Sequence, residues 1–294
     1  MRNVLLTGAS GFLGRKIVEA WNPLLGRLYI CTGNKTITYD SELIVFDRDR
    51  LIDEIDLSNI DLIINCAFPM KKDGTDAFRG LDFIERMIIK AENSGVKYFI
   101  NISSQSLYDP NRTYQAKEDD ILCLRDAYTS GKYYVEKILS FVCKNMKYIN
   151  VRLASLIGIG LDSRIINKFI ISSIQDGHIN LFGGNQIFEY MDVSDAASAI
   201  LELCKRTDFI DEYNVCNLGV NKSYKLQELS NKVAEIGREM GISEIKIFVE
   251  ENAVFSNNAI DSKKFYNNIN WQPVFGIEDS IRKIYKDKIR DLNY

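Results

Sequence analysis

Histidine, proline and paired cysteines are scarce in this chain of 294 residues. It has one histidine, His178, four prolines, and six cysteines that form no Cys-x-x-Cys pair. A single histidine excludes Ser-His-Asp and Cys-His nucleophilic catalysis, and it argues against a zinc site, so we expect no metal. Most of the cysteines lie in apolar runs, which predicts buried free thiols in a reducing cytoplasm.

Long apolar runs and blocks of one charge sign are also missing. No stretch approaches the roughly 20 apolar residues that span a bilayer, and the chain starts with a strand pattern where a signal peptide would be apolar and helical. The 37 basic and 40 acidic residues give a net charge of −3, which argues against nucleic acid as the main partner. We therefore expect a cytoplasmic globular protein that acts on a small molecule, without a nucleic-acid or membrane partner.

Three glycines near the N-terminus form the most informative motif. An apolar run at residues 4–6 is typical of a buried strand; Gly8, Gly11 and Gly14 follow, and a helical pattern covers residues 15–21. In such a unit the glycines allow a sharp turn, a close approach to a pyrophosphate, and close packing of the helix on the sheet. The N–H groups of the first helical turn then face the phosphates. The segment predicts a dinucleotide-binding loop.

Strands alternate with helices through the first half of the chain. Strands are predicted at residues 4–6, 27–32, 43–46, 61–67, 96–102 and 148–153, and long helices at 75–93 and 128–145. Alternating elements with near-continuous apolar strands predict an α/β fold with a doubly wound parallel sheet, a Rossmann fold. Ligands of such sheets bind beyond the carboxyl ends of the strands.

Shorter elements follow residue 153. Helices are predicted near residues 162–175, 194–205, 226–240 and 277–289, and strands near 179–182, 213–218 and 244–249. We expect residues 1–155 to form the dinucleotide-binding Rossmann domain, joined by parts of 178–218. Residues 156–294 should form a smaller C-terminal α/β lobe that binds the substrate.

A tyrosine and a lysine stand four residues apart at the start of a predicted helix. This spacing places Tyr128 and Lys132 on one helix face, and Ser104 ends the preceding strand. A free tyrosine has a pKa of about 10, and a nearby cation lowers it. The trio can act on a carbonyl: Ser104 donates a hydrogen bond, Tyr128 exchanges the proton, and Lys132 holds the charge and can reach a cofactor ribose. Taken alone, a Tyr-x-x-x-Lys spacing also arises by chance on helix surfaces.

Further segments accompany this trio in a fixed order. They are the loop 7–14, Asp47, Asn65-Cys-Ala67, Ile102-Ser-Ser-Gln-Ser-Leu-Tyr108, Tyr128-Thr-Ser-Gly-Lys132 with Glu136, Arg152, Tyr190-Met-Asp-Val-Ser-Asp195, Tyr213-Asn-Val-Cys-Asn-Leu-Gly219 and Trp271-Gln-Pro273. From Thr7 to about Tyr285 the chain therefore resembles the extended short-chain dehydrogenase/reductase superfamily, in its NAD-dependent epimerase/dehydratase group acting on nucleotide sugars. The resemblance implies a homodimer formed through the helix that carries Tyr128 and the helix before the fifth strand.

The motifs and the resemblance together assign the site residues. The catalytic residues are Ser104, Tyr128 and Lys132. The cofactor-binding residues are Gly8, Ser10, Gly11, Phe12, Leu13, Gly14, Thr32, Asn34, Lys35, Asp47, Arg48, Ala67, Tyr128 and Lys132. The substrate-binding residues are Phe68, Ser104, Gln105, Ser155 and Arg164.

Departures from the family pattern refine the expected activity. The acidic residue that usually closes the second strand and binds the ribose is missing, and Thr32, Asn34 and Lys35, or Arg15, would accept a 2′-phosphate, so NADP is preferred over NAD. The Asp-Glu pair of the dehydratases is replaced by Gln105 and Ser106, which argues against 4,6-dehydratase activity.

The substrate end departs from the family pattern too. The arginine that usually holds the nucleotide diphosphate aligns with Phe188, and the asparagine that usually follows the sixth-strand arginine aligns with Ser155. Arg164, Lys168 or Lys222 would then hold the diphosphate.

Three functions remain open from the sequence. The first is an NAD(P)H-dependent reductase that reduces the 4-keto group of a nucleotide-linked keto-deoxysugar. The second is a nucleotide-sugar 4-epimerase with tightly bound NAD. The third is a non-catalytic dinucleotide-binding regulator, although such members of the family tend to lose the tyrosine or the lysine.

Overall fold

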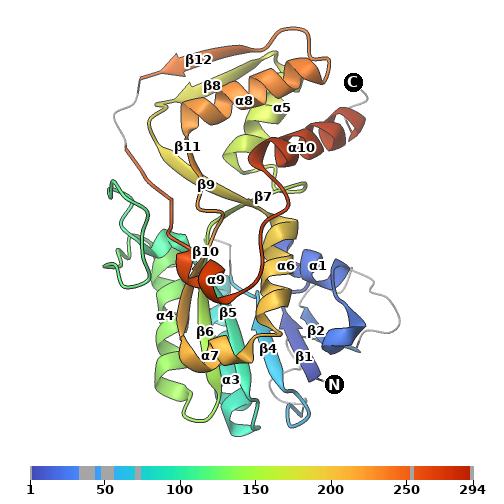
Figure 1. The fold of residues 1–294 in the computed structure, drawn as a ribbon, viewed down its shortest axis with the longest axis vertical. Helices are drawn as coiled ribbons and strands as arrows, with labels where there is room; N and C mark the ends of the chain where they lie inside the picture. The colour runs from blue at the N-terminus through green and yellow to red at the C-terminus, as the bar shows by residue number, and fades with distance from the viewer. Residues whose placement is uncertain (1, 33–43, 48–55, 70–73, 252–254, 292–294) are drawn as a thin grey trace.

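A seven-stranded parallel sheet forms the centre of the computed structural model, which describes residues 2–32, 44–47, 56–69, 74–251 and 255–291 (Figure 1). Its strand order is β10-β6-β5-β4-β1-β2-β3. The strands are β1 (Arg2–Thr7), β2 (Gly26–Thr32), β3 (Ile44–Asp47), β4 (Leu62–Asn65), β5 (Tyr98–Ser104), β6 (Lys147–Leu153) and β10 (Val215–Leu218). The prediction of a doubly wound parallel sheet is confirmed.

Helices cover both faces of this sheet (Figure 1). On one face α1 (Phe12–Glu19) and α6 (Val193–Leu203) pack in a core that includes Val4 and Leu6 of β1. On the other face α3 (Gly74–Asn93) and α4 (Ala127–Val142) pack in a core that includes Leu5. Successive strand residues point to opposite faces, and both faces are buried. This explains the near-continuous apolar runs of the sequence.

A row of polar side chains crosses the sheet within the core on the α3 and α4 side. The Thr7 hydroxyl donates to Asn65 Oδ1 (2.7 Å), Asn65 Nδ2 to Asn101 Oδ1 (3.0 Å), and Asn101 Nδ2 to Asn150 Oδ1 (2.8 Å). The four residues face one another in the registers of β1, β4, β5 and β6, and all are buried. The row satisfies these buried polar groups in sequence, as a protein interior requires.

A smaller lobe follows the sixth strand (Figure 1). Its core lies among α5 (Ile165–Gln175), α8 (Leu226–Glu239), α10 (Ile277–Asp291) and the paired strands β8 (His178–Phe182) and β12 (Lys246–Glu250). A second small sheet has the order β11-β9-β7, formed by β11 (Ser223–Lys225), β9 (Ile187–Asp192) and β7 (Ser155–Ile157). Between these elements the chain returns to the main sheet, where α6 packs beside α1 and β10 pairs with β6.

Several short elements were not predicted. They are β7, β9, β11, α7 (Thr207–Glu212), α9 (Lys263–Asn268), and the 3-10 turns η1 (Pro23–Leu25) and η2 (Gln105–Leu107). Each has only three to six residues, which is too short for a hydrophobic period to be recognised.

All six cysteines are free thiols: Cys31, Cys204 and Cys216 are buried, and the other three are half-buried. Across the described ranges, no helix combines the length and the apolar character that a membrane crossing needs.

Candidate active site

A cavity of about 520 Å³ lies at the carboxyl ends of the central strands. Segments that follow β1, β4, β5 and β6 line it, together with the first turns of α4 and the residues that lead into α5. The strand order reverses between β1 and β4, and such reversals are where doubly wound sheets bind their ligands.

The glycine loop supplies one wall of the cavity. Gly8 has φ +71°, and a Cβ atom on Gly14 would lie 2.1 Å from the carbonyl oxygen of Gly8. Side chains at these positions would therefore push α1 away from the end of β1. Gly11 is the N-cap residue of α1, no side chain in the described residues caps the helix there, and its first turn has no acidic residue. Free N–H groups and no competing carboxylate suit a pyrophosphate, so the loop fits a dinucleotide.

A capping box fixes the start of α4. The Asp126 carboxylate accepts a hydrogen bond from the Thr129 N–H (2.8 Å), and the Thr129 hydroxyl accepts one from the Asp126 N–H (3.1 Å). The helix therefore begins at Ala127, so Tyr128 lies in its first turn and Lys132 one turn later. Both side chains line the cavity.

Ser104 and Tyr128 lie together at the carboxyl end of β5, where both line the cavity. The Ser104 hydroxyl accepts a hydrogen bond from the Ser106 N–H (3.1 Å), which starts the η2 turn. Burial raises the pKa of Tyr128, while a hydrogen bond with Ser104 and the charge of Arg164 act to lower it. Tyr128 is thus kept as a neutral phenol that carries a proton near neutral pH.

The environment of Lys132 differs from the predicted one. Its ammonium donates to the carbonyl oxygen of Ile102 (2.7 Å) and lies 4.1 Å from the centre of the Phe68 ring. Burial lowers the pKa of Lys132 to about 8, and Cys66 and Glu136 oppose this. The cation that acts to lower the pKa of Tyr128 is Arg164. A role for Lys132 in stabilising the charge on Tyr128 stays a prediction.

A buried ion pair between Arg152 and Glu136 joins α4 to β6. Arg152 of β6 donates from Nε and Nη2 to both oxygens of Glu136 (3.1 and 2.9 Å), and Ser103 donates to the same carboxylate (2.5 Å). Arg152 also donates to the Tyr108 hydroxyl (3.0 Å) and to the carbonyl of Glu118 (2.9 Å). Because Glu136 lies one turn after Lys132, these contacts hold the face of α4 that carries Lys132 against β5 and β6.

The structure brings most of the predicted site residues together. The residues that line the cavity are Gly11, Phe12, Leu13, Phe68, Ser104, Gln105, Tyr128, Lys132, Ser155 and Arg164. Gly8, Ser10 and Ala67 lie in the loops next to this lining, and Gly14 lies in the first turn of α1; Gly8 packs directly against Ala67. Thr32 and Asp47 are paired at the ends of β2 and β3. Asn34, Lys35 and Arg48 lie outside the described residues.

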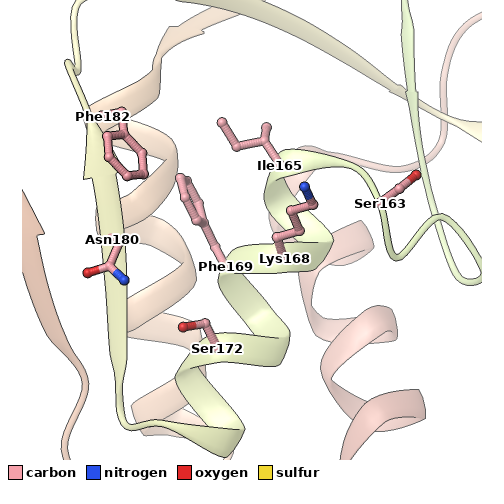
Figure 2. A pocket seen from close by; sticks show the side chains of 7 residues that line it. All are labelled: Ser163, Ile165, Lys168, Phe169, Ser172, Asn180 and Phe182. Carbon is pink, nitrogen blue, oxygen red and sulfur yellow. The ribbon is translucent and has the colours of Figure 1, made fainter. Parts of the chain in front are cut away.

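A second cavity of about 380 Å³ lies between α5 and β8 (Figure 2). Phe169 of α5 and Phe182 of β8 face it, and Lys168 stands at its edge. Ser163 and Ile165 line it too, on either side of Arg164 in the first cavity. Of the residues that line this cavity, only Lys168 was predicted from the sequence to bind substrate. The helical spacing of Ile165, Lys168, Phe169 and Ser172 marks one face of α5, but without β8 the same pattern reads as core.

The fold of the chain is shared with known nucleotide-sugar enzymes. UDP-glucose 4-epimerase of Thermotoga maritima superposes with a TM-score of 0.82 at 18% identity over 99% of both chains. UDP-N-acetylglucosamine 4-epimerase of Methanobrevibacter ruminantium M1 gives 0.80 at 21% over 99% of both. The NDP-hexosamine 5,6-dehydratase TunA, involved in tunicamycin biosynthesis, gives 0.81 at 18% over all of both chains. At these identities the likeness shows the fold.

Sequence comparison identifies the family. No curated protein sequence matches the chain. The family model for the NAD dependent epimerase/dehydratase family matches residues 4–219, which include the glycine loop, the Ser104, Tyr128 and Lys132 trio, and β10. The match spans well over half of the chain and agrees with the nicotinamide-dependent chemistry that the cavity suits. The chain belongs to the NAD dependent epimerase/dehydratase family.

Proposed function

We propose that this protein is an NAD(P)H-dependent reductase that reduces the keto group of a nucleotide-linked sugar. One observation carries the proposal: Ser104, Tyr128 and Lys132 line the same cavity as the first turn of α1. A dinucleotide on that turn and a sugar beside Tyr128 would therefore meet in one enclosed space.

The side chains divide the work of such a reduction. A bound nicotinamide supplies the hydride. The Ser104 hydroxyl donates a hydrogen bond to the carbonyl oxygen, and Tyr128, kept protonated by burial, gives that oxygen its proton. Lys132 lies one helical turn after Tyr128 on α4, and its ammonium is held by the carbonyl of Ile102. From there it would reach a ribose of the bound cofactor. Arg164 then stabilises the phenolate that Tyr128 becomes.

The second cavity suits the nucleotide half of the substrate. Arg164 and Lys168 are exposed cations at the boundary of the two cavities, and neither forms an ion pair within the described part of the chain. Two cations there suit a diphosphate. Beyond them, the rings of Phe169 and Phe182 offer an apolar space for a planar base (Figure 2). Phe188, at the position of the usual family arginine, stacks on Tyr190 (5.8 Å between ring centres), so Arg164 and Lys168 take over that role.

NADP is the preferred cofactor in this proposal. The strand β2 ends at Thr32 without an acidic residue, and the exposed Arg15 lies in the first turns of α1. A cation there would attract a 2′-phosphate, and no carboxylate at the end of β2 would repel it. Comparing the affinities for NADPH and NADH checks the preference, and a tighter NADH complex would contradict it.

A 4-epimerase is the second candidate, because two of the three similar structures described above are nucleotide-sugar 4-epimerases. The two functions differ in cofactor turnover. A reductase consumes one NADPH for each nucleotide 4-keto-6-deoxysugar. An epimerase is purified with NAD bound and interconverts the C4 epimers of UDP-glucose without net consumption. Absorbance of the reduced nicotinamide, followed with both classes of sugar, separates them, and no consumption with any 4-keto sugar refutes the reductase.

Replacing Tyr128 distinguishes an enzyme from a non-catalytic dinucleotide-binding regulator. Tyr128→Phe removes the proton donor but keeps the ring, so turnover should fall by about 10²- to 10⁴-fold while cofactor affinity is unchanged. Tyr133→Phe, on the same helix, is the matched control and should turn over normally. Equal rates in the two variants would contradict the role of Tyr128.

We also propose a homodimer formed through α3 and α4. Their outer surfaces expose Phe78 and Ile89 of α3 and Tyr134 and Phe141 of α4. Four large apolar side chains on two adjacent helices favour burial against a second copy. Sedimentation equilibrium measures the state, and Phe141→Glu should shift a dimer to monomers; a wild type that sediments as a monomer would contradict the proposal.

A further inference from the structure

Gln105 is a buried amide in the wall of the catalytic cavity. It follows Ser104 directly, opens the η2 turn and lines the cavity with Tyr128 and Lys132. Only 3% of its surface is exposed. Glutamine is rarely buried to this extent without partners for both ends of its amide.

One end of this amide has no partner. Gln105 Nε2 donates to the Ser106 hydroxyl (3.3 Å), whereas Oε1 accepts no hydrogen bond within the described part of the protein. Three other buried polar atoms share this property, on Arg112, Asn167 and Ser262, but none of those residues lines the catalytic cavity. A buried acceptor left unpaired destabilises the fold unless a bound molecule supplies the donor.

The backbone around Gln105 is fixed on both sides. The Gln105 carbonyl accepts from the Tyr108 N–H (3.1 Å), and the Cys123 N–H donates to the carbonyl of Leu107 (2.7 Å). The nearby Arg125 side chain is engaged with the carbonyl of Ser106 (3.1 Å). The turn therefore holds the amide in the cavity wall, one residue from the serine that contacts the reacting oxygen.

We propose that Gln105 selects the sugar, accepting through Oε1 a hydrogen bond from a ring hydroxyl next to the carbon on which Tyr128 acts. The inference rests on the proposed function, because it takes the cavity ligand to be a nucleotide-linked sugar. A site with a buried acceptor rejects a ligand that lacks the matching donor, because binding that ligand leaves the acceptor without a hydrogen bond from either the ligand or water. Gln105 is then a specificity-determining residue, separate from the proton transfer that Ser104 and Tyr128 perform.

The experiment compares hydroxyl recognition in wild type and in Gln105→Met, which keeps the length of the side chain and removes the amide. Both proteins, loaded with NADP, are titrated calorimetrically with UDP, UDP-glucose, and its 2-, 3- and 6-deoxy analogues, and with the dTDP series if dTDP-glucose binds more tightly. Gln272→Met, at an exposed glutamine, is the matched control. We expect wild type and control to bind the 3-deoxy analogue roughly 5- to 150-fold more weakly than the parent, because C3 carries the ring hydroxyl next to C4. Gln105→Met should bind the two about equally, with the affinity for UDP unchanged.

Two results overturn the inference while leaving the proposed function intact. In one, wild type prefers the parent sugar and Gln105→Met keeps the same preference. In the other, Gln105→Met loses affinity for NADP itself, which would assign the amide to the cofactor. A wild type that binds UDP-glucose and dTDP-glucose no better than UDP and dTDP would refute the proposed substrate class and the inference together.

Discussion

Replacing Arg152 with methionine tests how α4 is held on the sheet. The change removes both hydrogen bonds that the guanidinium donates to Glu136, and those to Tyr108 and the carbonyl of Glu118. Glu136 would then keep only the Ser103 hydroxyl, with 7% of its side chain exposed. Leaving a buried charge without its partner costs about 3–5 kcal/mol, so we expect the free energy of unfolding to fall by that amount.

Urea unfolding, followed by circular dichroism, measures the loss. Arg290→Met is the control, because Arg290 pairs with Asp287 at the surface with 77% of its side chain exposed; such a pair contributes about 0–1 kcal/mol. The double variant Glu136→Met, Arg152→Met should be less destabilised than the sum of its single variants, since it buries no unpaired charge. Additive losses, or an Arg152→Met no less stable than the surface control, would refute the reasoning.

Two further predictions concern the glycine loop and Lys132. A Cβ on Gly14 would lie 2.1 Å from the carbonyl oxygen of Gly8, so Gly14→Ala should lower the free energy of unfolding by about 1–3 kcal/mol and weaken NADH binding in fluorescence titration. The control is Gly276→Ala, where the added atom has an ordinary 3.4 Å contact, and this variant should bind NADH normally. Equal NADH affinities in the two variants would contradict the close packing of Gly14 on Gly8. The pKa of Lys132 is lowered from 10.5 to about 8, so the folded protein binds fewer protons than the unfolded chain between these values and its stability should rise with pH across that window. Lys132→Met should lack this rise, up to about 3 kcal/mol; a wild-type-minus-variant difference in urea unfolding that is flat across the window would contradict the burial.

The sheet and the gathering of Ser104, Tyr128 and Lys132 around one cavity could be predicted because their determinants are local. The three glycines mark a strand–loop–helix unit, and the spacing of Tyr128 and Lys132 places them on one face once a helix begins before them. The capping box that sets this start, Asp126 with Thr129, is also a local pattern. Long apolar strands leave little choice of fold class.

Contacts made across the fold could not be predicted. The Phe68 ring reaches Lys132 from the loop after β4, and Arg164 acts on the pKa of Tyr128 from the start of α5. Both contacts join residues that are distant in sequence. The second cavity likewise needs α5 and β8 together. In the sequence, Phe169 and Phe182 are two ordinary apolar residues of different elements.

The row of Thr7, Asn65, Asn101 and Asn150 fixes the relative positions of the loops that line the cavity. Sliding any one strand by a single residue would move its polar side chain out of the row and leave at least two buried polar groups without a partner, so the four strands have one energetically acceptable alignment. From this common line the chain runs one residue to the first glycine, two to Ala67 and three to Ser104. Three side-chain hydrogen bonds within the sheet thus set the position of Ser104 relative to the glycine loop, before any ligand binds.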